Sequence, residues 1–120
     1  MQQKYKIDPI YIGYDRALAG YWVEEMESNG FNMEKVAQGP FTWSQPMREM
    51  GATFADKKVN YNNNPILKWC MSNTAVKKSG LNNIQPVKIT EKRRIDGMVS
   101  LLNAWVVYVK YFDDYMYHVN

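Results

Sequence analysis

Two aspartates stand where a carboxylate could reach a ligand. Asp15 follows a short β-rich run, and Asp96 follows a cluster of cations near the start of the longest apolar-periodic segment. Open α/β sheets usually bind ligands at the carboxyl ends of their strands, and Asp96 lies off the apolar stripe of its predicted helix, beside the small residue Gly97. Carboxylate oxygens suit Mg²⁺ or Mn²⁺, with waters and substrate phosphate as further ligands. The pair is a candidate metal site, although most aspartates at strand ends are structural or solvated.

Positive charge is concentrated in one third of the chain. Residues 57–94 carry nine lysines and arginines against one acid, which gives a net charge of +8. Residues 1–56 carry five cations against eight acids, and residues 95–120 carry one cation against three acids, so both flanks are acidic. The basic segment can form a surface that binds a polyanion, but a charge run is as often only a solvated surface.

Other kinds of chemistry have little support. His118 is the single histidine and stands near the C-terminus, where a general base is seldom held rigidly. Cys70 is the single cysteine, which excludes an internal disulfide and a cysteine metal cluster. Its apolar helix face predicts a small buried side chain. The sequence has no GxxxxGKS, GxxxxGKT or GxGxxG motif, so nothing in it predicts a phosphate-binding loop.

The overall composition predicts a globular protein that acts in the cytosol. With 120 residues and a hydrophobic content of 46%, the chain can bury a core as a single domain, residues 1–120, or as part of one. No apolar run reaches the roughly 18 residues that suggest a membrane span. The first residues also lack the apolar core of a signal peptide.

The first part of the chain predicts strands and helices in alternation. A strand over residues 9–14 ends at Asp15, and a helix follows over residues 16–28. Residues 33–38 form a weaker strand candidate. This order places Asp15 at the carboxyl end of a strand.

The middle of the chain predicts two helices. Ser44 can cap the first, with Pro46 in its first turn. After a short strand at residues 59–61, Asn64 caps the second helix and Pro65 occupies its first position. This second helix is expected to bury Ile66, Leu67, Trp69 and Cys70.

The last third predicts a basic hairpin and a long helix. Residues 74–78 and 84–89 form the two strands of the hairpin. The helix should begin with Thr90 as its cap and run to about residue 112, leaving residues 113–120 as a trailing end.

The first turn of that long helix has an unusual charge order. A helix N-terminus normally favours acids and disfavours cations, yet Lys92, Arg93 and Arg94 precede Asp96. The order is explained if the cations face phosphate groups while Asp96 faces a metal.

Several short motifs follow one another along residues 5–108. They are Ile12-Gly13-Tyr14-Asp15-Arg16, Glu27-Ser28-Asn29-Gly30-Phe31, Gln38-Gly39, Ser44-Gln45-Pro46, Asn64-Pro65-Ile66-Leu67-Lys68-Trp69, Met71-Ser72-Asn73-Thr74-Ala75-Val76-Lys77, Lys88, and Arg94-Ile95-Asp96-Gly97. Each is weak alone, but their order is specific. Together they resemble the C-terminal nuclease domain of the large terminase subunit of tailed bacteriophages.

The resemblance implies an α/β fold of the RNase H-like type, with a mixed sheet flanked by helices. It implies a nuclease that cuts concatemeric phage DNA during packaging and holds Mg²⁺ or Mn²⁺ at a two-metal site. Asp15 matches the family's middle acid, and Asp96 matches its last acid. The residues expected to hold the DNA backbone are Lys77, Lys78, Lys88, Arg93 and Arg94.

The family's first acid has no clear counterpart, because it lies on an opening strand upstream of Asp15. Asp8 is a poor substitute, since it lies on nearly the same strand as Asp15. We therefore expect the C-terminal part of a longer terminase, without its ATPase domain and with a sheet incomplete on the N-terminal side. Alone, these residues should be inactive, and the exposed sheet edge could pair with another copy.

The implied partners are double-stranded DNA, the terminase small subunit and the portal protein, in the cytoplasm of the host cell and without a membrane. Two other interpretations remain. The chain could be a non-catalytic RNase H-like module that binds DNA or a packaging partner. It could also be an unrelated α/β domain with a basic surface, in which case the two aspartates should lie far apart.

Overall fold

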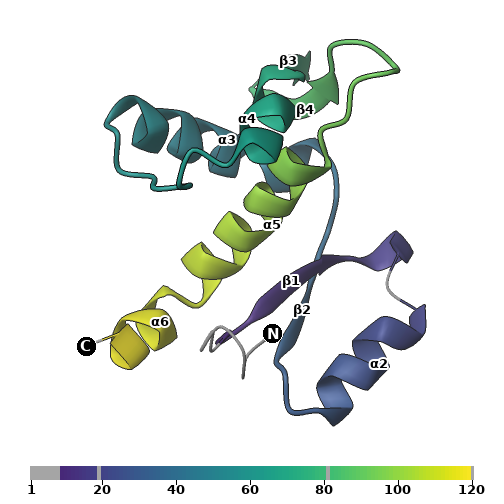
Figure 1. Cartoon of the computed structure of the whole chain (residues 1–120), viewed down its shortest axis with the longest axis vertical. Coiled ribbons are helices and arrows are strands. Elements are labelled where there is room, and N and C mark those ends of the chain that lie inside the picture. Colours follow the sequence, from purple (N-terminus) through teal and green to yellow (C-terminus); the bar gives the residue numbers. More distant parts are fainter. Residues whose placement is uncertain (1–8, 19, 81, 120) are drawn as a thin grey trace.

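The computed structural model describes residues 9–18, 20–80 and 82–119, which form strands and helices in mixed order (Figure 1). The elements are β1 (Ile12–Asp15), η1 (Arg16–Leu18), α2 (Gly20–Ser28), β2 (Met33–Val36), α3 (Pro40–Ala55), α4 (Pro65–Ser72), β3 (Thr74–Ser79), β4 (Asn83–Lys88), α5 (Asp96–Lys110) and α6 (Phe112–Val119).

The N-terminal half contains a strand–helix–strand unit. β1 and β2 pair in parallel, with Ile12 opposite Met33 and Asp15 opposite Val36. A parallel pair needs a crossover, and α2 supplies it. The predicted strands over 9–14 and 33–38 are confirmed in shorter form, while the predicted helix over 16–28 is divided into η1 and α2.

The second sheet is the predicted basic hairpin. β3 and β4 pair antiparallel, with Thr74 opposite Lys88 and Ser79 opposite Asn83. In the described part of the chain the four strands form two separate pairs. The mixed α/β class is confirmed, and the small sheets are consistent with an incomplete one.

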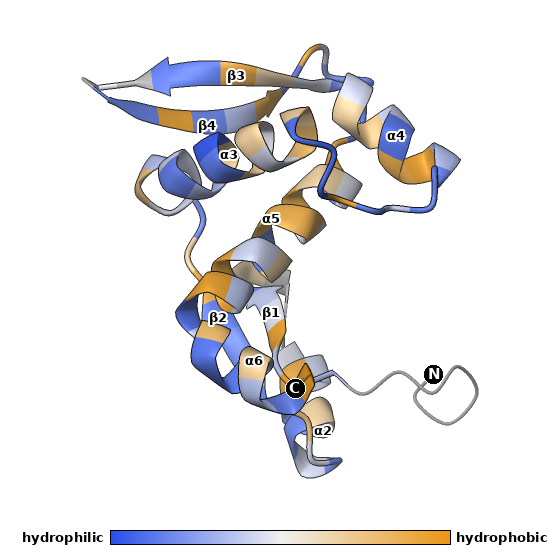
Figure 2. Cartoon of the chain, turned by 90° about the vertical axis from the view of Figure 1, so that its left-hand side faces the viewer, coloured by the Kyte–Doolittle hydropathy of each residue, from blue (hydrophilic) through white to orange (hydrophobic). Residues whose placement is uncertain are grey.

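Helix α5 lies at the centre of the molecule and connects the two halves. It contacts β1, β2, α3 and α4, and hydrophobic segments run along it between the two sheets (Figure 2). Leu102 is fully buried and Val107 is nearly so, together with Val36, Trp43 and Met50 of the neighbouring elements. Leu102 lies on the apolar stripe predicted for this helix, whereas the buried Val107 was not predicted and Val109, which was predicted to be buried, is 47% exposed.

The predicted start of α3 is wrong. The helix begins at Pro40, after Gly39, whose φ of 127° favours glycine. Ser44 lies inside the helix, where its Oγ donates to the carbonyl of Pro40 and accepts from the backbone N–H of Ile84 at 2.8 Å. The hydroxyl thus connects α3 to the hairpin, and Pro46 is a helix-interior residue.

The predicted cap of α4 is confirmed, but its predicted burial is wrong in part. The Asn64 side chain accepts from the N–H groups of Ile66 and Leu67 at 3.0 and 3.1 Å. Cys70 is buried, whereas Ile66 is 70% exposed and Trp69 is 42% exposed. The short helix packs on α5 through one side, so its apolar residues do not share a single buried face.

Three further predictions fail in the loops and at the C-terminal end. Residues 59–61 form no strand. The helix expected from Thr90 begins at Asp96, because residues 90–93 form a turn in which Arg93 N–H donates to Thr90 at 3.0 Å. Residues 113–119 continue as α6 instead of trailing away.

No helix among the described residues is long and apolar enough to cross a membrane.

Candidate functional site

Asp15 is the last residue of β1, at the carboxyl end predicted for it. Its Oδ1 accepts a hydrogen bond from the backbone N–H of Ala17 at 3.0 Å, which turns the chain from the strand into η1. The residue is half-buried and pairs in register with Val36 of β2. The local fold therefore holds this carboxylate at the end of the sheet and uses one of its oxygens.

Asp96 is the first residue of α5 and is exposed. A carboxylate is favourable there because the first turn of a helix carries partial positive charge. Gly97 lets the same turn approach α4, since a Cβ on it would lie 3.1 Å from Sγ of Cys70. The cations Lys92, Arg93 and Arg94 precede the helix, so the reversed charge order predicted within a helix does not occur.

Packing between β1 and α5 orients Asp15 toward the Asp96 end of the helix. Tyr11 stacks on Tyr111 with 3.8 Å between ring centroids. Two residues later, a Cβ on Gly13 would meet Val107 at 2.8 Å and the carbonyl oxygen of Asn103 at 2.9 Å. The strand thus runs antiparallel to the helix, toward the helix N-terminus.

Two buried asparagines support the elements that carry Asp15 and Asp96, and no role was predicted for either of them from the sequence. Asn73 follows α4, is 2% exposed, and donates from Nδ2 to the carbonyl of Arg94 at 2.9 Å. Its own carbonyl accepts from Ile89 N–H at 2.9 Å. Asn73 therefore holds both sides of the loop that precedes Asp96.

The second asparagine lies on α5. Asn103 is 8% exposed, and its Oδ1 lies 3.4 Å from Nε2 of Gln38, which also donates to the carbonyl of Val36 at 2.9 Å. The end of β2 is thereby joined to α5. A buried polar side chain on an otherwise apolar helix stripe is the signal that could have identified Asn103.

The predicted DNA-binding cations lie on the hairpin and on the loop before α5, and all five are exposed. Lys77 and Lys78 are neighbours on β3, so they point to opposite faces of the hairpin. Lys88 pairs opposite Thr74 and shares the face of Lys78. The structure therefore separates Lys77 from Lys78 and Lys88, while Arg93 and Arg94 follow in the loop.

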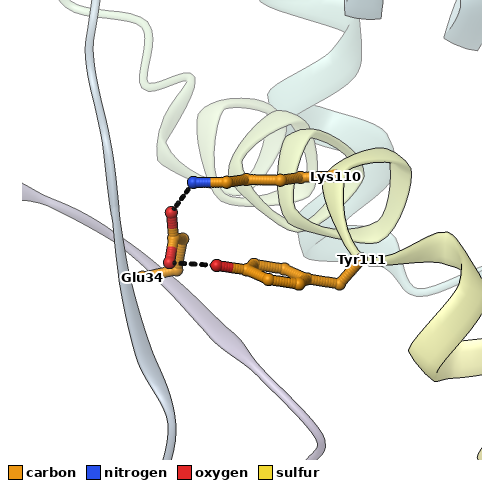
Figure 3. A network of polar contacts seen from close by, with 3 residues as sticks. All are labelled: Glu34, Lys110 and Tyr111. Carbon is orange, nitrogen blue, oxygen red and sulfur yellow. Dashed lines mark hydrogen bonds and ion pairs between the residues drawn. The ribbon is translucent and has the colours of Figure 1, made fainter.

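The groups with displaced pKa values lie at the other end of α5 (Figure 3). Lys110 pairs with Glu34, and Tyr111 donates to Glu34 at 2.8 Å. Hydrogen bonding from Lys110, and then from Tyr111, lowers the pKa of Glu34. The hydrogen bond from Tyr11 to Asp114, at 2.6 Å, raises the pKa of Tyr11 to about 12. These contacts attach β1 and β2 to the end of α5 and to α6.

The donor set fits a divalent metal only in part. Asp15 and Asp96 supply the hard oxygen ligands that Mg²⁺ and Mn²⁺ prefer. Among the residues that the structure describes, no group of three or more His, Cys, Asp or Glu side chains could hold a metal ion. Asp8 lies outside the described residues. The described residues therefore do not by themselves form a site of three or more such ligands.

A comparison with known families decides the relationship. The model of the terminase large subunit endonuclease domain matches residues 4–110. The chain belongs to this family. The resemblance carried by the ordered motifs is thereby confirmed, and nuclease domains of terminases are in general dependent on divalent metal.

Two known proteins are similar to this terminase chain. Protein YmfN of Escherichia coli strain K12 is 29% identical over 82 residues, which cover 67% of this chain and 18% of YmfN. The crystal structure of the HK97 bacteriophage large terminase matches with a TM-score of 0.72 at 20% identity, covering 84% of this chain and 22% of that one. The latter confirms the RNase H-like fold. The terminase chain thus spans about a fifth of the length of either protein.

Proposed function

We propose that this chain is the catalytic part of a metal-dependent endonuclease that cuts concatemeric viral DNA during packaging. The observation that carries the proposal is the placement of Asp15 and Asp96 within a terminase endonuclease fold. One stands at the end of β1, and the other begins the helix along which β1 runs.

In this proposal the two carboxylates hold Mg²⁺ or Mn²⁺ together with ligands from outside the described residues. The metal, when bound, activates water and neutralises charge on the phosphodiester. The part of this chain is to hold and orient. Asn73 fixes the loop before Asp96, and the Gln38–Asn103 contact fixes the end of β2 beside α5.

The basic residues serve the DNA backbone in this proposal. Phosphate contacts position a protein on DNA but carry little sequence information. DNA binding should weaken as the salt concentration rises. A plot of log affinity against log salt concentration should have a slope of about −0.9 for each neutralised phosphate. The cations proposed for this role are Lys77, Lys78, Lys88, Arg93 and Arg94. The proposed partners are the terminase small subunit and the portal protein, in the host cytoplasm.

The test is made in the complete terminase subunit that contains this segment. Asp96→Ala should reduce plasmid cleavage in Mn²⁺ by at least a factor of about 100, because a metal ligand is lost. Asp113→Ala removes an exposed aspartate from the first turn of α6 and is the matched control. Undiminished cleavage by Asp96→Ala, or equal loss in both variants, would contradict the ligand role.

A second candidate function is a DNA-binding or partner-binding module without catalysis. It is favoured by the lack of a three-acid cluster among the described residues. If this second function is correct, the 120 residues should bind DNA in a salt-dependent way. The complete subunit should then cleave DNA equally well with and without Asp96→Ala. The nuclease proposal predicts that the variant binds DNA normally and fails to cut.

A further inference from the structure

Two of the four tryptophans are exposed, and they lie in opposite electrostatic surroundings. Trp69 on α4 is 42% exposed, follows Lys68 and belongs to the basic segment 57–94. Trp22 on α2 is 47% exposed, and the charged residues of that helix are all glutamates. The two rings are thus similar in exposure, but only Trp69 lies among cations.

Helix α4 carries Trp69 on a face that is turned away from α5. Leu67 packs on the first turn of α5, since a Cβ on Gly97 would lie 3.3 Å from its Cδ1. Ile66 and Trp69 are three residues apart and share a neighbouring face of α4, where Ile66 is 70% exposed. Because Gly97 follows Asp96, this exposed face of α4 lies beside the helix turn that carries Asp96.

Further cations lie at the C-terminal end of α4. Asn73 comes one turn after Trp69, and its carbonyl accepts from Ile89 N–H while its side chain donates to the carbonyl of Arg94. These two hydrogen bonds hold residues 88–94 against the end of the helix, and Ile89 is 57% exposed. The exposed cations of this loop are Lys88, Lys92, Arg93 and Arg94. The aromatic face of α4 is therefore bordered by Lys68 on the helix and by the cations of the loop.

We infer that the exposed face of α4 binds unpaired bases of DNA, with one base stacked on Trp69 and the adjoining phosphates held by Lys68 and the cations of residues 88–94. Proteins that bind single-stranded nucleic acid combine cations along the backbone with aromatic rings on which bases stack. A base inside a duplex has both faces covered by its neighbours, so the ring selects a nucleotide that has left the stack. The acids of α2 repel phosphate, which excludes Trp22 from the same role.

The inference deepens the proposed function and rests on it for the role of Asp96. A base stacked on α4 fixes one DNA strand beside the first turn of α5, where Asp96 is proposed to hold metal. The class of DNA that suits this surface has unpaired nucleotides close to the cut, as in a bulge, a frayed end or a single-stranded overhang.

The experiment measures the fluorescence anisotropy of labelled oligomers of about ten nucleotides with the intact 120-residue chain, in the absence of metal. A thymidine oligomer is compared with an abasic oligomer, which has the same number of phosphates but no bases. The chain should bind the thymidine oligomer at least about fivefold more tightly, the lower end of the contribution of one stacked base. A duplex with a short bulge should likewise bind more tightly than a fully paired duplex of the same length.

Variants of the two exposed tryptophans test the location. Trp69→Leu keeps an apolar side chain but removes the ring, so the affinity for the thymidine oligomer should fall at least about fivefold, to that for the abasic oligomer. Trp69→Phe retains an aromatic face and should retain most of the affinity. Trp22→Leu is the matched control and should leave both affinities unchanged.

Photocrosslinking tests the same contact without a variant, in case Trp69→Leu does not fold. A thymidine oligomer that contains one 5-iodouracil should crosslink to Trp69 of the unmodified chain, as mapped by mass spectrometry. Crosslinking to Trp22 with none at Trp69 would contradict the proposed location.

Two further results would overturn the inference. Equal affinity for the thymidine and abasic oligomers would show that the surface binds charge alone, and equal effects of Trp69→Leu and Trp22→Leu would show that the basic surroundings have no part. Oligomer binding is measured without metal and does not depend on Asp96 as a ligand. Base-dependent binding at Trp69, in a protein whose complete subunit cuts DNA independently of Asp96, would keep this inference and contradict the proposed function.

Discussion

The two ends of the β1–α5 contact are built in opposite ways. At one end, Glu34, Lys110 and Tyr111 form an ion pair and a hydrogen bond, and Tyr11 stacks on Tyr111. At the other end stand the carboxylates of Asp15 and Asp96, and neither forms an ion pair among the described residues. Charge is therefore paired inside the protein at the first end, and the two carboxylates of the second end have no such partner among the described residues.

The first end, the tyrosine-rich end, fixes β1 against α5 through the stacking of Tyr11 on Tyr111. At the second, the aspartate end, Asp15 is held by strand pairing and by the hydrogen bond from Ala17 N–H. Asn73 supplies the corresponding support at the aspartate end, through the backbone of Arg94. Both ends are connected through Gly13, which lies between them on β1.

The largest expected effect follows from filling the space at Gly13. Gly13→Ala places a methyl group 2.8 Å from Val107 and 2.9 Å from a backbone oxygen, so the strand must move away from α5. Urea denaturation should show that the free energy of unfolding falls by at least about 1–3 kcal/mol. Gly51→Ala is the control. A Cβ at this position of α3 meets no atom within 4 Å, so the free energy of unfolding should rise by about 0.5–1 kcal/mol. Equal effects of the two variants would contradict the close packing of β1 on α5.

Removing the support of the aspartate end should have the next largest effect. Asn73→Ala leaves the carbonyl of Arg94 without its buried donor, at a cost of about 1–3 kcal/mol. It should also shift the NMR signals of Asp96 and weaken Mn²⁺ binding. Asn64→Ala is the stability-matched control, since losing a helix cap costs about 1 kcal/mol. If Asn64→Ala weakens Mn²⁺ binding equally, Asn73 has no specific part in positioning the loop.

The smallest effect concerns pH at the tyrosine-rich end. The pKa of Glu34 is lowered, so its stabilisation is present above the ordinary value of about 4.3 and is lost as pH falls through the folded-state value. The wild type should therefore lose more stability on acidification than Glu34→Gln, as measured by urea midpoints. Glu24→Gln, on α2, should retain the wild-type acid dependence. The same acid dependence in both variants would show that the Lys110 contact is not populated.

Tyr11 gives a second pH effect, in which stability is lost as the pH rises instead of as it falls. The hydrogen bond to Asp114 raises the pKa of Tyr11 to about 12, so its stabilisation is present below about 10 and is lost as pH rises toward 12. Tyr11→Phe should remove this part of the alkaline loss. An unchanged alkaline profile would contradict the attachment of α6 through Tyr11.

Local patterns predicted the elements better than their contacts. The alternation around Asp15, the Asn64–Pro65 cap and the hairpin were predictable because each depends on neighbouring residues. The α3 start was missed because Ser44 uses its hydroxyl for a strand distant in sequence, and α6 was missed because Tyr11 and Tyr111 hold it in place. The position of Asp15 at the end of a strand was predicted from residue type and spacing. Asp96 was expected one turn inside a helix that began at Thr90, but it is the first residue of the helix, and the contact of Asn73 that supports it required the tertiary fold.

The most direct measurement of the central claim is Mn²⁺ titration of the 120-residue chain followed by NMR line broadening. If Asp15 and Asp96 contribute to one site, their amide signals should broaden together and at lower Mn²⁺ than those of Glu34 and Asp113. Asp96→Ala should then reduce broadening at Asp15 as well. Broadening that begins at Asp113, or that affects Asp15 and Asp96 independently, would contradict a shared metal site at this end of α5.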